Sequence, residues 1–104
     1  MGREFDKLVR DEIPVVIKQN GEKPVTSRVT GEDYSDRLVE KLEEEVDEYR
    51  ESRSLEELAD ILEVVHAIRK RKGVSVDELN EKRAQKAEQR GRFDEGVVLE
   101  RVEK

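Results

Sequence analysis

The amino-acid sequence predicts an all-α protein, and three observations lead to that class. Between residues 32 and 90, apolar residues recur at intervals of three and four, the spacing of one face of a helix. Glycine and proline divide the chain into four segments of helical length and a tail. No stretch alternates apolar and polar residues over the length of a β-strand. With 104 residues, we expect one domain that covers residues 1–104.

The first expected helix is short and runs from about Asp11 to Gln19. Asp11 is a suitable N-cap, and Pro14 is tolerated in the first turn of a helix. The dipeptide Asn20-Gly21 supplies a left-handed exit. Residues 22–30 contain a proline and several β-branched residues, so we expect an extended connector there.

The next two expected helices are joined by a short loop. The first of them runs from residue 32 to about residue 50 or 51. Ser54, followed by Glu57, has the pattern of a capping box and opens the second. That helix continues to about residue 72, because Gly73 is a natural stop. Two helices joined by so short a loop should form an antiparallel hairpin.

A fourth helix and an apolar tail complete the chain. Ser75, followed by Glu78, repeats the helix-start pattern and predicts a helix that ends before Gly91. We expect the tail to lie on the helices as an extended segment, because four of its residues are apolar: Val97, Val98, Leu99 and Val102.

Composition excludes several classes of chemistry. The chain has no Cys and one His, so it cannot form a disulfide, a thiolate nucleophile or a zinc site built from Cys or from several His. The net charge of -6 opposes nonspecific binding of nucleic acid. No run approaches the ~20 apolar residues of a membrane span or the apolar region of a signal peptide. We therefore expect a cytoplasmic protein that binds neither nucleic acid nor membrane.

Glu45 lies on the apolar face of the first long helix. On a helical wheel it falls within about 20° of Leu38, between Leu42 and Tyr34. An unpaired carboxylate in such a place is costly unless its pKa shifts or a cation neutralises it. Glu48 borders the same face.

Two acids of the next helix are expected to meet this pair. On the wheel, Glu57 lies within the apolar sector and Asp60 lies just beyond it. Glu45 and Asp60 are equally distant from the turn of the hairpin, and so are Glu48 and Glu57. Residues at equal distances from a tight turn lie at similar heights, so the four carboxylates should converge.

Four converging carboxylates predict a site for a hard cation. Ligation by oxygen alone selects Mg²⁺ or Mn²⁺, with water and substrate phosphate as the remaining ligands. A plainer interpretation stays open, in which Glu45 pairs with Lys41 or with a base of a partner chain. Glu57 also occupies the third position of a capping box.

The same acids carry a resemblance to a known family. Glu45-Val46-Asp47-Glu48 and Glu57-Leu58-Ala59-Asp60 resemble the paired E-x-x-E and E-x-x-D signature of the all-α nucleoside triphosphate pyrophosphohydrolases, the MazG-like superfamily. Residues 7–14 and 86–93 resemble the two ends of its phosphoribosyl-ATP-pyrophosphohydrolase-like branch. The resemblance implies that Mg²⁺ is held by Glu45, Glu48, Glu57 and Asp60 while water cleaves between the α and β phosphates. It also implies a dimer or paired dimers.

Two groups of bases are candidates for binding substrate phosphate. One face of the fourth helix carries four of them: Lys82, Arg83, Lys86 and Arg90. Lys7 and Arg10 precede the first helix and form the second group. The bases of the fourth helix equally fit a solvated helix end, where the helix dipole stabilises cations. Lys7 and Arg10 equally fit surface ion pairs.

These observations predict a Mg²⁺-dependent enzyme that converts a nucleoside triphosphate to the monophosphate and pyrophosphate. The resemblance implies an enzyme that removes noncanonical nucleotides. The alternatives are the same chemistry on phosphoribosyl-ATP in histidine biosynthesis and a non-enzymatic helical dimerisation or adaptor domain. The apolar sector of the third helix is about 180° wide, more than one hairpin needs. We expect a homodimer, or a dimer of dimers, in which two hairpins form a four-helix bundle and bury Val64 and Ile68.

Overall fold

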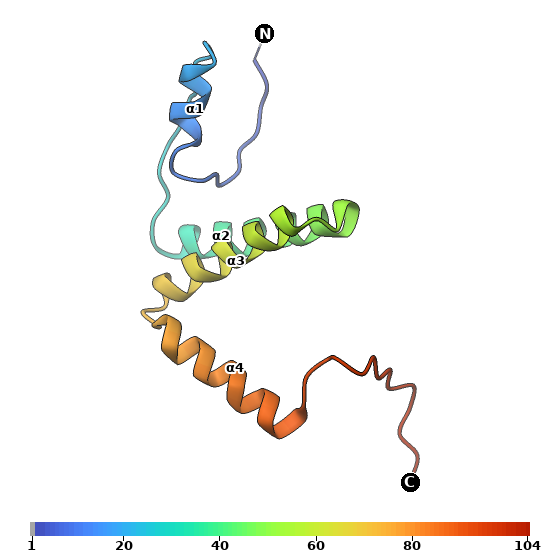
Figure 1. The fold of residues 1–104 in the computed structure, drawn as a ribbon. Helices are drawn as coiled ribbons and strands as arrows, with labels where there is room; N and C mark the ends of the chain where they lie inside the picture. Colours follow the sequence, from blue (N-terminus) through green and yellow to red (C-terminus); the bar gives the residue numbers. More distant parts are fainter. Residues whose placement is uncertain (1) are drawn as a thin grey trace.

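A computed structural model describes residues 2–104, which contain four helices and no strand (Figure 1). The all-α prediction is therefore confirmed, and each predicted helix end lies within two residues of the observed one. The bounds are α1 Ile13–Gln19, α2 Gly31–Ser52, α3 Leu55–Arg71 and α4 Val76–Arg90.

Helices α2 and α3 form the expected hairpin and make most of the contacts between helices. The turn is tight because Arg53 adopts a left-handed conformation, with φ 57°, and its backbone N–H donates to the carbonyl of Tyr49 at 2.8 Å. The next residue, Ser54, accepts a hydrogen bond from the backbone N–H of Glu57 at 3.4 Å. These caps fix the register between the two helices.

The core of the hairpin is small, since Leu38 and Val64 are its buried apolar residues within the described chain. The expectation that Val64 needs a second chain to cover it is wrong, because Val64 is only 8% exposed. The exposed apolar face of α3 lies elsewhere, at Leu58 and Leu62. In a sector as wide as that of α3, periodicity alone does not say which edge faces α2.

Helix α1 begins later than the sequence predicts. Asp11 is not its N-cap, because a turn in which the backbone N–H of Ile13 donates to the carbonyl of Arg10 at 3.1 Å precedes the helix. Glu12 occupies the cap position and makes no capping hydrogen bond through its side chain. Pro14 lies in the first turn as expected, and Gly21, with φ 82°, provides the left-handed exit.

Helix α4 begins at a complete capping box formed by Ser75 and Glu78. It contacts α3 and projects away from the hairpin (Figure 1). The prediction that the tail lies on the helices is wrong. Residues 92–104 are exposed along their whole length, and Val97 and Val98 are 85% and 80% accessible.

The chain is extended, with principal dimensions of 62 × 32 × 25 Å. Its radius of gyration is 18.2 Å, whereas a compact domain of this length has about 13 Å. A single chain therefore leaves much apolar surface in water. No helix within residues 2–104 has both the length and the apolar character that crossing a membrane requires.

Candidate metal centre

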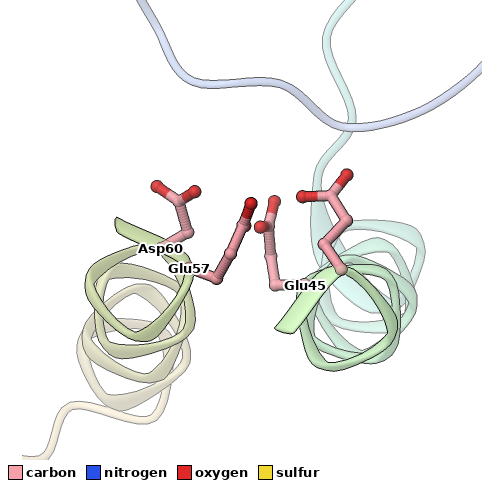
Figure 2. A group of neighbouring side chains, drawn as sticks. Glu45, Glu57 and Asp60 are labelled. Atoms are coloured by element: carbon pink, nitrogen blue, oxygen red, sulfur yellow. The ribbon is translucent and has the colours of Figure 1, made fainter. Parts of the chain in front are cut away.

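The hairpin brings together the four acids that the sequence selects (Figure 2). Glu45 and Glu48 come from α2, and Glu57 and Asp60 come from α3. Each offers one carboxylate oxygen, and these four oxygens lie within 4.8 Å of one another. We call these four residues the acidic cluster.

The convergence follows from helix geometry and the short turn. Residues three apart lie on one side of a helix, so each helix presents its two acids together. The turn at Arg53 then sets the two pairs at matching heights. The carboxylates of α2 and α3 accordingly point toward the same space, as Figure 2 shows.

Glu45 is the buried member of the acidic cluster, with 6% of its surface exposed. Its Oε1 pairs with the Lys41 ammonium at 3.2 Å, so the plainer interpretation holds for one oxygen. Its Oε2 is buried and has no hydrogen-bond partner among the described residues, and the same is true of Glu57 Oε2. Burial raises the pKa of Glu45, Lys41 opposes that rise, and the nearby Glu48 carboxylate adds to it.

The geometry and the donor set fit a hard divalent cation. Mg²⁺ binds oxygen at about 2.0–2.1 Å, so opposite ligands of an octahedron lie about 4.2 Å apart. The observed spread of up to 4.8 Å therefore needs a closure of less than about 1 Å. A divalent cation would also offset part of the negative charge of the four carboxylates and would engage the two buried oxygens that have no partner.

The N-terminal segment before α1 brings cations to the cluster, and its trace crosses above the carboxylates in Figure 2. Arg10 Nη2 lies 2.7 Å from Asp60 Oδ1. Lys7 Nζ lies 2.9 Å from Glu44 Oε1, one residue before Glu45. Lys7 and Arg10, one of the two predicted groups of bases, thus lie at the site, where both form the ion pairs that the sequence left open as the alternative.

Glu44 is a residue that the sequence reasoning missed. Burial favours its neutral form, but ion pairs with Lys7 and Lys41 outweigh burial and lower the pKa of Glu44. The hydrogen bond to Glu44 raises the pKa of Lys7. The spacing of Lys41 and Glu44 could have indicated their pair, whereas nothing periodic connects Lys7 to a residue 37 positions away.

The second predicted group of bases does not reach the cluster within one chain. The four bases of α4 are exposed, and α4 starts beyond the far end of α3. Asp60 lies 12 residues before Lys72, which is ~18 Å along a helix axis. The proposed phosphate clamp of Lys82, Arg83, Lys86 and Arg90 is therefore not part of this site in a single chain.

An open acidic groove adjoins the cluster along α2. It has a volume of about 450 Å³ and is lined by six acids: Glu40, Glu43, Glu44, Asp47, Glu48 and Glu51. Such a surface repels an anion.

Comparisons with protein-family models, with curated proteins and with solved structures found no match. The acidic cluster and the bases beside it are therefore the features of this chain that indicate a function.

Proposed function

We propose that the protein is a Mg²⁺-dependent nucleoside triphosphate pyrophosphohydrolase, which releases a nucleoside monophosphate and pyrophosphate. The observation that carries the proposal is the acidic cluster, in which Glu45 and Glu57 each keep a buried oxygen without a partner. The bases Lys7 and Arg10 at its edge supply positive charge for phosphate oxygens. The resemblance of the two acidic motifs to the MazG-like signature supports the same chemistry.

In the proposed reaction, the acids would hold the metal and activate the attacking water. Bound Mg²⁺, or Mn²⁺ in its place, would neutralise phosphate charge and lower the pKa of a bound water. Glu45, Glu48, Glu57 and Asp60 would hold the ion, and one of their carboxylates accepts the proton of the attacking water. The water oxygen bonds to phosphorus as the bond between the α and β phosphates breaks, and pyrophosphate leaves.

A nucleotide panel tests the proposal directly. Pyrophosphate release is measured with and without Mg²⁺ on canonical and modified nucleoside triphosphates and on phosphoribosyl-ATP, so that the panel separates the two enzymatic alternatives. Glu57→Gln should lower the rate at least about 100-fold, because a lost metal ligand costs several kcal/mol in the transition state. Glu63→Gln is the matched control, since Glu63 is an exposed glutamate of the same helix.

We also propose that the protein assembles as a homodimer or a dimer of dimers. The exposed apolar residues of the hairpin support this, with Leu58 46% and Leu62 55% accessible on α3, and Val39 50% and Val46 41% on α2. Helical periodicity places Leu58 and Leu62 on one side of α3, and Val39 and Val46 on one side of α2. Two such hairpins would pack as a four-helix bundle.

The same exposed residues favour one alternative function, a non-enzymatic helical dimerisation domain. In that case the acids would be surface charge. Glu57→Gln would then leave both the oligomeric state and the response to Mg²⁺ unchanged, and no nucleotide in the panel would be cleaved.

A further inference from the structure

Arg10 is the cation in direct contact with a cluster carboxylate from outside the hairpin. The Arg10 guanidinium and the Asp60 carboxylate lie 2.7 Å apart, and their side chains are 54% and 35% exposed. The guanidinium therefore occupies one of the four acids that a metal would use. Exposed ion pairs of this kind are weak, so a divalent cation can displace the guanidinium.

Other contacts keep the segment at the site when this pair breaks. The backbone bends at Asp6, where φ is 49°. Arg37 of α2 donates to the Asp6 carbonyl at 2.9 Å and pairs with its carboxylate at 3.3 Å. Lys7 is held by Glu44, which is outside the acidic cluster. A guanidinium that leaves Asp60 thus remains anchored within reach of the same space.

We propose that Arg10 exchanges partners: it is the counterion of Asp60 in the metal-free protein and a ligand of substrate phosphate once Mg²⁺ occupies the acidic cluster. This inference rests on the proposed function, because it assumes that Mg²⁺ binds there. At each stage of the exchange the Arg10 guanidinium faces a negatively charged group. The guanidinium neutralises a carboxylate before metal arrives, and its forked N–H donors then face an anion of the type they bind best.

The exchange gives one residue opposite effects on two ligands. Without Arg10, Mg²⁺ no longer competes with a cation for Asp60, so Mg²⁺ should bind more tightly. A phosphate ligand loses its forked donor, so it should bind more weakly. A residue that only supports the fold of the site would weaken both.

Calorimetric titration of the full chain tests this signature, first with Mg²⁺ and then with inorganic triphosphate added to the Mg²⁺-saturated protein. Arg10→Gln should bind Mg²⁺ about two- to fivefold more tightly and triphosphate about tenfold more weakly. Arg10→Lys keeps the charge, so its Mg²⁺ affinity should stay near that of the wild type while its triphosphate affinity falls. Arg3→Gln is the control, because Arg3 belongs to the same N-terminal segment but forms its exposed ion pair with Glu22, outside the acidic cluster.

The outcomes separate this inference from the proposed function. If Mg²⁺ binds Arg10→Gln no more tightly than the wild type, Arg10 does not compete with the metal and the exchange is refuted. Unchanged triphosphate binding in both Arg10 variants refutes it equally. If the wild-type protein binds no Mg²⁺, the proposed function itself fails.

Discussion

Glu45 is a carboxylate whose burial costs free energy in the folded protein. Burial raises the pKa of Glu45, so its ionised form is disfavoured in the folded state. An acid with a raised folded-state pKa binds more protons when folded than when unfolded, over the range between the ordinary pKa and the raised one. Stability therefore falls as pH rises through that range, and the cost of the charge persists at neutral pH.

Removing this charge should stabilise the metal-free protein. Glu45→Gln keeps the size of the side chain, so we expect its melting temperature in chelator at pH 7 to exceed that of the wild type by a few °C. The difference should disappear as pH falls to the ordinary pKa of a glutamate, where the wild-type carboxyl is protonated and is therefore neutral like the amide of the variant. Calorimetry over a pH series measures the difference in melting temperature and its dependence on pH. If Glu45→Gln were less stable than the wild type at pH 7, the ionised Glu45 carboxylate would not be destabilising.

Mg²⁺ should reverse that ranking. A cation that binds only the folded state raises the melting temperature by mass action, so added Mg²⁺ should stabilise the wild type. Glu45→Gln should lose most of the effect because it lacks a ligand. Glu56→Gln and Glu63→Gln should retain it, since both residues are exposed on α3. An equal Mg²⁺ effect in Glu45→Gln would exclude Glu45 as a ligand.

At the residue scale, the sequence predicts contacts within the helices better than contacts from the N-terminal segment. Glu45 could be found because helical periodicity places it among apolar side chains. The pairs that join Lys7 to Glu44 and Arg10 to Asp60 span 37 and 50 positions. A segment without regular structure has no periodicity from which such pairs could be predicted.

At the scale of elements, local signals account for the helix ends. Ser54, Ser75 and Gly73 act through hydrogen bonds or backbone conformation within a few residues, so the sequence shows them directly. The face of α3 that meets α2 depends on the register of the whole hairpin. For that reason the burial of Val64 was predicted wrongly, while the convergence of the acids, which uses only distance from the turn, was predicted.

The stability of α4 should depend visibly on its capping box, because α4 has few contacts with the rest of the chain. Ser75→Ala removes the hydrogen bond to the backbone N–H of Glu78, which is 3.1 Å long. We expect a loss of about 1 kcal/mol in helix stability. Hydrogen exchange of the amides in the first turn of α4 should accelerate about fivefold. Ser27→Ala, in the exposed connector before α2, should leave that exchange unchanged.

At the scale of the whole molecule, the extended shape follows from how little apolar surface each chain can cover. Leu38 and Val64 are a very small core for 104 residues, and a domain of this size is only marginally stable even when compact. The tail stays exposed along its whole length in one chain. The position of the tail could not be predicted from its apolar residues, since these residues indicate that burial is favourable but do not indicate which surface would bury them.

The proposed assembly would cover the exposed apolar residues of the hairpin with a second copy of the chain. In a symmetric dimer, each exposed leucine of α3 would be buried in both chains, because the same surface of each chain forms the interface. Light scattering at micromolar concentration should therefore report at least twice the chain mass of 12.1 kDa. Leu62→Lys should weaken the dimer at least about 100-fold, because burying one leucine contributes roughly 1.5–3 kcal/mol and the interface contains two copies.

Val25→Lys is the control for that substitution, since Val25 is 94% exposed in the connector and away from the hairpin. It adds the same charge at an apolar residue and should leave the dimer intact. A wild-type chain that remains monomeric would refute the assembly. If that monomer still gained stability from Mg²⁺, the proposed metal site would remain valid without the dimer, because all four carboxylates of the acidic cluster come from one hairpin.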